Sequence, residues 1–134
     1  MQNELNIREE FSKFLKTQKH YSTDDLVFEF VIEKMRIDLL IHNKSIKNNS
    51  VDLKSNPYLA LVEFKADGNN LDSATKQIKS YLEALNYPKL PCFLVIPSNN
   101  ANEVFDVFLL TTYGLQQISK EHFPDITTLS NNLI

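Results

Sequence analysis

The stretch Tyr58–Lys65 (YLALVEFK) decides how this chain folds. Its apolar residues predict a buried strand, in which successive side chains point to opposite faces. Glu63 and Lys65 then share a face with Leu59 and Leu61, at the end of the strand. A carboxylate and an amine are costly to bury without partners. We therefore expect a partner at this position, and a metal ion is a good candidate.

The composition is ordinary for a soluble globular protein, with 43% hydrophobic and 23% charged residues among 134. This length predicts a single domain with one core, spanning residues 1–134. Residues 127–134 are weakly patterned, and we expect them to be a tail or the boundary of the domain.

The sequence contains no signal for a membrane or for export. No apolar run reaches the ~18 residues of a membrane-spanning helix, and the polar, acidic N-terminus lacks the apolar core of a signal peptide. The single cysteine, Cys92, excludes an internal disulfide framework and fits a reducing compartment. We therefore expect a cytoplasmic protein in which Cys92 is a small buried hydrophobic residue.

Hydrophobic periodicity predicts an α/β fold with a central mixed β-sheet flanked by helices. The predicted elements are helices over 5–18 and 72–85 and strands over 26–34, 35–42, 58–65, 92–96 and 104–110. Asp72 or Ser73 is expected to cap the second helix. Residues 114–119 are expected to begin a short helix or a terminal turn, and the polar stretch 43–57 to form a loop.

Asp38 is a second polar anomaly, because it interrupts the apolar strand 35–42. If this strand and 58–65 are antiparallel neighbours, Asp38 and Glu63 face each other on one surface of the sheet. Two adjacent carboxylates repel each other, and a divalent cation relieves the repulsion. Such oxygen ligands suit Mg²⁺ or Mn²⁺. Lys65 beside the metal would orient or deprotonate a water molecule, or neutralise charge that develops on a phosphate.

The second predicted helix supplies further polar residues. Gln77 and Tyr81 are four residues apart and hence on one face, and Gln77 could hold a water, a phosphate oxygen or Lys65. Lys76 and Lys79 on the same helix, with Lys89 after it, either touch phosphate or belong to a solvated face. The formal net charge of −3 argues against strong non-specific binding of nucleic acid by this chain alone.

The polar residues on two predicted strands and one predicted helix have the order and spacing of a known family. They are Asp38, Glu63-Phe64-Lys65 and Gln77-x-x-x-Tyr81. This set resembles the PD-(D/E)XK nuclease superfamily, and the likeness is closest to the N-terminal nuclease domain of type I restriction enzyme motor subunits and to RecB-like nucleases. The resemblance implies a restriction-endonuclease-like core with a Mg²⁺-dependent phosphodiesterase site, in which Mn²⁺ can replace Mg²⁺.

The resemblance also implies a set of metal ligands. By it, Asp38 and Glu63 bind the metal together with the backbone carbonyl of Phe64. A glutamate of the first helix sometimes adds a ligand in this superfamily, and Glu10 is the nearest candidate here. The proline that often precedes the aspartate is absent, since Ile37 stands there.

The remaining residues of the set receive supporting roles from the same resemblance. Lys65 matches the residue that assists the attacking water, and Gln77 matches one that supports the site. Tyr81 matches a residue that contacts DNA or braces the fold. Lys76 and Lys79 are the basic residues on that helix that could join it on DNA.

We therefore expect a Mg²⁺-dependent endonuclease domain that acts on DNA in restriction or phage defence. Other domains, a motor or specificity subunit or a homodimer mate would supply target choice. We expect no membrane and no small-molecule cofactor. The chain has two glycines and no glycine-rich phosphate loop, which counts against a nucleotide-hydrolysing motor in this chain.

Two alternatives stay open. The first is a catalytically inactive restriction-endonuclease-like binding or interaction module, in which Asp38–Arg36 and Glu63–Lys65 are structural salt bridges. The second is a nuclease directed at RNA.

Overall fold

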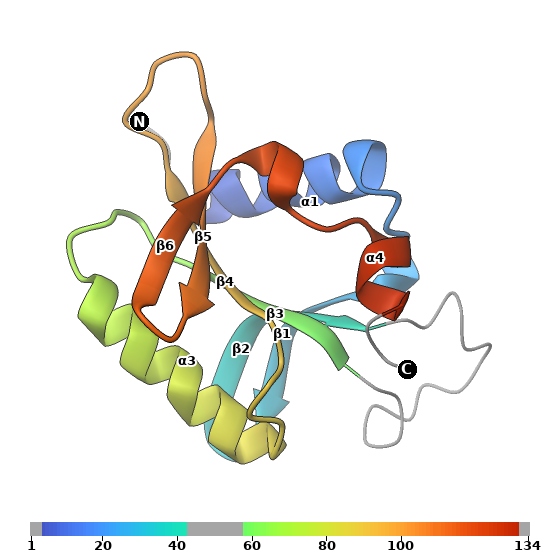
Figure 1. The fold of residues 1–134 in the computed structure, drawn as a ribbon, viewed down its shortest axis with the longest axis vertical. Coiled ribbons are helices and arrows are strands. Elements are labelled where there is room, and N and C mark those ends of the chain that lie inside the picture. The colour runs from blue at the N-terminus through green and yellow to red at the C-terminus, as the bar shows by residue number, and fades with distance from the viewer. Residues whose placement is uncertain (1–3, 43–57, 132–134) are drawn as a thin grey trace.

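The computed structural model describes residues 4–42 and 58–131, and in it helices cover both faces of a six-stranded sheet (Figure 1). The elements in chain order are α1 (Glu4–Gln18), η1 (Thr23–Asp25), β1 (Leu26–Ile32), β2 (Met35–His42), β3 (Tyr58–Phe64), α3 (Leu71–Leu85), β4 (Cys92–Pro97), β5 (Phe105–Thr111), β6 (Gly114–Ile118), η2 (Lys120–His122) and α4 (Ile126–Asn131). This arrangement confirms the α/β class and the mixed sheet. The loop predicted over 43–57 lies outside the described residues.

The strands lie in the sheet in chain order, from β1 to β6. Neighbouring strands are antiparallel except β3 and β4, which are parallel. A parallel pair needs a crossover connection, and α3 provides it. The crossover places α3 against the sheet next to the end of β3, where the polar residues of the opening stretch lie (Figure 1).

Alternation along β3 divides the hydrophobic core into two sides. Phe64 packs in the cluster under α1, whereas Leu61 packs in a second cluster with Ile78 of α3. Glu63, two residues after Leu61, therefore falls on the α3 side of the sheet. Cys92 belongs to the second cluster, and burial raises the pKa of its thiol to about 12. Cys92 is thus the buried residue that the sequence predicts.

Leu59 departs from the predicted alternation, because it packs on the α1 side rather than with Leu61. The pairing of β2 with β3 gives the reason. Ile41 pairs with Ala60 and His42 with Tyr58, so Leu59 is an extra residue between two paired positions. One extra residue reverses which side chains face which side of a sheet.

An aromatic cluster holds α1 on the sheet. The ring of Phe11 on α1 meets Phe64, Phe105 and Phe123 edge-on, with centroids 5.3–5.7 Å apart. Edge-on pairs at such distances are the favoured geometry for aromatic rings. These contacts fix α1 against the end of β3, on the side opposite to α3.

The ends of α3 are capped by asparagines. The side chain of Asn70 accepts a hydrogen bond from the Ser73 amide at 3.2 Å, so the predicted cap at Asp72 or Ser73 is wrong. The helix begins at Leu71, and Asn70 has the non-helical backbone that a cap requires. Asn86 ends the helix in the left-handed conformation, with φ at 55°.

The C-terminal part contains the main departure from the predicted elements. A helix or turn is predicted over 114–119, but the structure has strand β6 there, paired with β5 in a tight hairpin. The Thr111 hydroxyl donates to the Gly114 carbonyl at 2.9 Å and closes the turn. Gly114 has φ at +101°, which L side chains rarely adopt. Pairing with β5, which local periodicity does not report, makes this segment a strand. Where the sequence predicts only a tail, the short helix α4 begins at Ile126.

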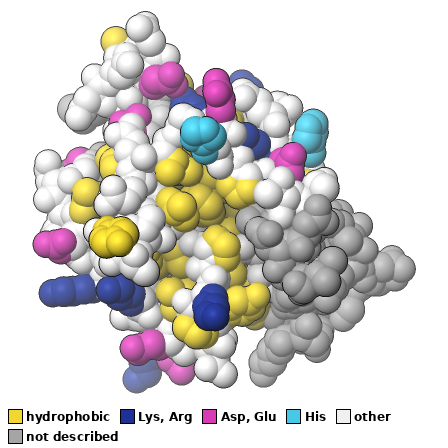
Figure 2. Space-filling model, in the orientation of Figure 1, with side chains coloured by type: hydrophobic (Ala, Val, Ile, Leu, Met, Phe, Trp, Pro, Cys, Tyr) yellow, Lys and Arg dark blue, Asp and Glu magenta, His cyan; other side chains and the backbone are white. Residues whose placement is uncertain are grey.

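The surface mixes charges of both signs. On the face shown in Figure 2, hydrophobic side chains gather near the middle, and basic and acidic side chains are interspersed around them. Among the described residues, Val31 and Tyr113 are the large hydrophobic side chains that are exposed. Within the same residues, no helix has the length and apolar character to cross a membrane.

The cap of α3 gives a testable prediction. Asn70→Ala removes the acceptor of the Ser73 amide, so we expect the free energy of unfolding in urea to fall by about 1 kcal/mol. Ser73→Ala keeps that amide and is the matched control, expected within about 0.5 kcal/mol of the parent protein. A larger loss for Ser73→Ala than for Asn70→Ala would mean that Ser73 caps the helix.

Candidate functional site

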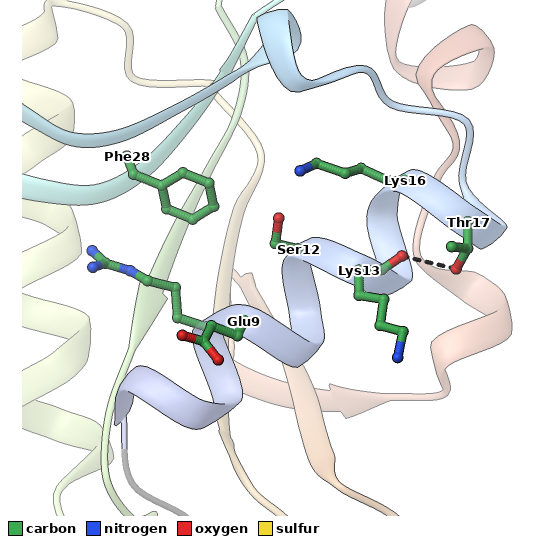
Figure 3. A pocket seen from close by; sticks show the side chains of 7 residues that line it. Glu9, Ser12, Lys13, Lys16, Thr17 and Phe28 are labelled. Atoms are coloured by element: carbon green, nitrogen blue, oxygen red, sulfur yellow. Dashed lines mark hydrogen bonds between the residues drawn. The ribbon is translucent and has the colours of Figure 1, made fainter.

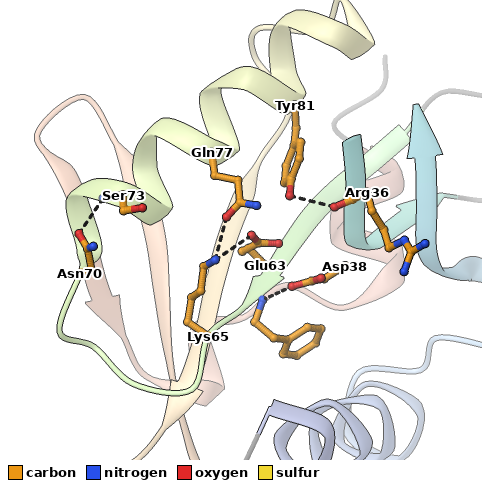
Figure 4. A network of polar contacts seen from close by, with 9 residues as sticks. Arg36, Asp38, Glu63, Lys65, Asn70, Ser73, Gln77 and Tyr81 are labelled. Carbon is orange, nitrogen blue, oxygen red and sulfur yellow. Dashed lines mark hydrogen bonds and ion pairs between the residues drawn. The ribbon is translucent and has the colours of Figure 1, made fainter. Parts of the chain in front are cut away.

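The antiparallel register of β2 and β3 places Asp38 opposite Glu63. Leu39 pairs with Val62, so the next position along the two strands brings the two acidic residues together. The amide of Phe64 donates to Oδ2 of Asp38 at 2.8 Å (Figure 4). This bond joins the Asp38 side chain to the backbone of β3 and fixes the carboxylate beside Glu63.

Glu63 is an acid held inside the core. Its side chain is 2% exposed, and its Oε1 has no hydrogen-bond partner. Burial, and after it the neighbouring Asp38, raise the pKa of Glu63 to about 9, although Lys65 acts in the opposite direction. Burial beside Asp38 thus disfavours the charged form of Glu63, and its Oε1 has no partner that would offset this cost.

Lys65 lies between Glu63 and the helix α3 (Figure 4). Its Nζ donates to Oε1 of Gln77 at 2.8 Å and lies 3.6 Å from Oε2 of Glu63. The Lys65 side chain is 36% exposed, so the amine reaches from the buried acid toward solvent. Of the partners predicted for Gln77, the structure shows the lysine.

Tyr81 braces the site from α3. Its hydroxyl donates to the carbonyl of Arg36 at 2.9 Å, and its side chain is 2% exposed. Burial, with Glu63 and Asp38 nearby, raises the pKa of the Tyr81 phenol. The residue thus ties α3 to β2 two positions before Asp38, and its burial fits the bracing role rather than contact with DNA.

Three predicted residues are not brought to this cluster. Glu10 is exposed and lines a different cavity, together with Phe105 and Lys120. Lys76 and Lys79 are exposed on α3. Within residues 4–42 and 58–131, no group of three or more His, Cys, Asp and Glu side chains is arranged to hold a metal ion.

The two salt bridges of the structural alternative fare differently. Glu63 and Lys65 form theirs. Arg36 instead pairs with Glu29 of β1, at 3.6 Å, rather than with Asp38. The carboxylate of Asp38 is therefore left to the Phe64 amide and to its neighbour Glu63.

Arg8 and Glu29 belong to this region, and sequence reasoning did not find them. Nη2 of Arg8 donates to the backbone carbonyl of Asp38 at 3.4 Å, and Nη1 lies 3.9 Å from Oε1 of Glu29. Glu29 of β1 lies opposite Asp38 of β2, and its backbone is left-handed, with φ at 54°. The pairing of β1 with β2 is regular on both sides of Glu29 but omits Glu29 itself. A left-handed glutamate inside a strand has no signature in the sequence, and such positions often mark functional regions.

The site contains two of the donors that a hard divalent cation would use. It offers the Asp38 carboxylate and a Glu63 oxygen that is buried and lacks a partner. Buried polar atoms normally have partners, and carboxylate oxygens are the ligands that Mg²⁺ prefers. The backbone carbonyl of Phe64, the residue between Glu63 and Lys65 in the sequence, is the predicted third donor. Glu10 lines a different cavity and is not available as a ligand at this site.

The raised pKa of Glu63 makes the stability of the protein depend on pH. The carboxyl group titrates near 4.5 without the fold and at about 9 within it. The contribution that favours folding is therefore complete below pH 4.5 and is lost as the pH rises toward 9. Glu63→Gln stays uncharged, so in EDTA it should gain stability over the parent protein by up to about 1.4 kcal/mol per pH unit in this window.

Urea unfolding at about pH 5, 6.5 and 8 measures this gain. Glu83→Gln is the matched control, because Glu83 is an exposed glutamate of α3, and its difference from the parent protein should not vary in this way. A Glu63→Gln difference that is the same at all three pH values would contradict the raised pKa.

Comparison of the chain with protein-family models, with curated proteins and with solved structures found no match. The function of this chain is therefore inferred from the residues of the site. These are the two facing acids, the lysine beside one of them and the glutamine that holds the lysine.

Proposed function

We propose that this chain is a Mg²⁺-dependent nuclease domain that hydrolyses phosphodiester bonds in DNA, built on a restriction-endonuclease-like core. The observation that carries the proposal is the buried Glu63, which lies opposite Asp38 and beside Lys65 with one oxygen unpartnered. An acid with a strongly raised pKa and specific charged neighbours is a candidate for function. A cation would use the free oxygen and remove the repulsion between the acids.

The proposal gives each residue of the site a task. Asp38 and Glu63 would hold the cation, which supplies charge stabilisation of the phosphate and an activated water. The Phe64 amide keeps Asp38 in place for this. The partly exposed Lys65 amine orients the water and offers positive charge to the phosphate. Gln77 is a positioning residue, because it acts through Lys65.

Recognition of the target is proposed to lie outside this site. The net charge of −3 and the interspersed charges of the face in Figure 2 argue against strong non-specific binding of DNA on that face. A motor or specificity subunit, or a second copy of the chain, would deliver the DNA in restriction or phage defence.

Cleavage assays test the proposal. The parent protein should cut plasmid and linear DNA with Mg²⁺ or Mn²⁺ and not in EDTA. Asp38→Ala and Lys65→Ala should each lower the rate by at least about 100-fold, since each removes a group that acts on the reacting atoms. Glu83→Gln, outside the site, should keep the parent rate. Metal-dependent cutting that survives both site substitutions would refute the assignment, and RNA cut in preference to DNA would reassign the substrate.

A catalytically inactive binding module is the second candidate. It is favoured by the fact that the described residues contain two facing acids but no group of three metal-ligating side chains. Calorimetric titration with Mn²⁺ separates the candidates. A nuclease site should bind the ion measurably, and Glu63→Gln should abolish the binding. An absence of heat for the parent protein would favour the inactive module.

A further inference from the structure

A groove of about 400 Å³ runs along α1 on the side that faces β1 (Figure 3). Its lining includes Arg8, Glu9, Ser12, Lys13 and Lys16 from α1 and Phe28 from β1. The α1 positions recur at three- and four-residue steps and so form one stripe of the helix. In Figure 3, Lys16 extends from α1 toward the strand that carries Phe28.

The groove has an excess of positive charge. Its lining contains three basic side chains and one acidic side chain. The basic ones are Arg8, Lys13 and Lys16, and the acidic one is Glu9. Glu29 lies nearby, but it is shared between Arg8 and Arg36. Because one carboxylate serves two arginines, it does not neutralise the groove.

Arg8 joins this groove to the candidate site. Its guanidinium lies 5.3 Å from the centroid of the Phe28 ring, and Nη2 donates to the carbonyl of Asp38. The left-handed Glu29 interrupts the ladder at the position opposite Asp38, where Arg8 makes this bond. Arg8, at one end of the groove, therefore contacts the backbone of the residue that carries one of the two acids.

We propose that the groove between α1 and β1 holds the phosphate backbone of the DNA strand that the site acts on. This inference rests on the proposed function. The stripe from Arg8 to Lys16 is roughly 12 Å long at 1.5 Å per residue, enough for about three nucleotides at 3.4 Å per step. The cations bind phosphates, and the Phe28 ring and the lysine stems offer apolar surface to sugars and bases.

Binding measured without cleavage tests the inference. Fluorescent single-stranded and duplex DNA would be titrated with the full chain in EDTA, at several salt concentrations, and followed by anisotropy. The double variant Lys13→Gln/Lys16→Gln removes two exposed charges but keeps most of each stem. We expect binding about tenfold weaker and a salt slope smaller by roughly 1.4–1.8, from 0.7–0.9 for each phosphate contact. Lys34→Gln, at an exposed lysine in the turn between β1 and β2, is the control outside the groove and should bind as the parent protein does.

Three results would overturn the inference. The first is no binding of either DNA by the parent protein, and the second is a double variant that keeps the parent affinity and salt slope. The third is displacement of the DNA by poly-glutamate at equal charge concentration, which would make the groove a site for acidic peptides.

Cleavage tests the proposed function, and binding in EDTA tests the groove. Asp38→Ala should abolish Mg²⁺-dependent cleavage and should still bind DNA in EDTA. If the double variant keeps the parent affinity and cleavage still depends on metal, the groove is refuted and the nuclease is not. If the double variant binds more weakly but the parent protein shows no metal-dependent cleavage, the nuclease is refuted and the groove is not.

Discussion

The burial of Glu63 opposite Asp38 is the interaction on which the rest of this structure depends. Burial and a neighbouring acid raise the pKa of Glu63 to about 9, so the core disfavours the charged form of this acid. Lys65 forms an ion pair with Oε2 of this group, whereas its Oε1 has no hydrogen-bond partner. The buried acid Glu63 lowers the stability of the fold when it is charged, and a bound cation would raise that stability again.

Two helices hold this pair of acids from opposite sides of the sheet. On one side, α3 lies over β3 because a parallel β3–β4 pair needs a crossover, and from there Gln77 holds Lys65. On the other side, α1 is fixed by aromatic contacts of Phe11, and from there Arg8 holds the backbone of Asp38. The helix that contacts the backbone of the site also lines the groove with Arg8, Lys13 and Lys16, so one element contributes to both proposals.

Much of this site could be predicted because it follows short-range periodicity. Period two places Leu61 and Glu63 on one side of β3, and the four-residue step places Gln77 with Tyr81 on one face of α3. Glu10 is a predicted metal ligand, but the structure places it at another cavity. Asn70 as the helix cap, β6 as a strand and the left-handed Glu29 escaped prediction, because each depends on a partner or a backbone angle that local patterns do not encode.

The sequence by itself determined the α/β class, the buried strand Tyr58–Phe64 and the polar residues at its end, because hydrophobic alternation is a property of neighbouring residues. The tertiary structure alone decided that Asp38 is bound by the Phe64 amide, that Arg36 turns to Glu29, and that Arg8 reaches the carbonyl of Asp38. These contacts join residues 7 to 30 positions apart in the chain. Their geometry depends on strand register and helix docking, which the packing of the whole core sets.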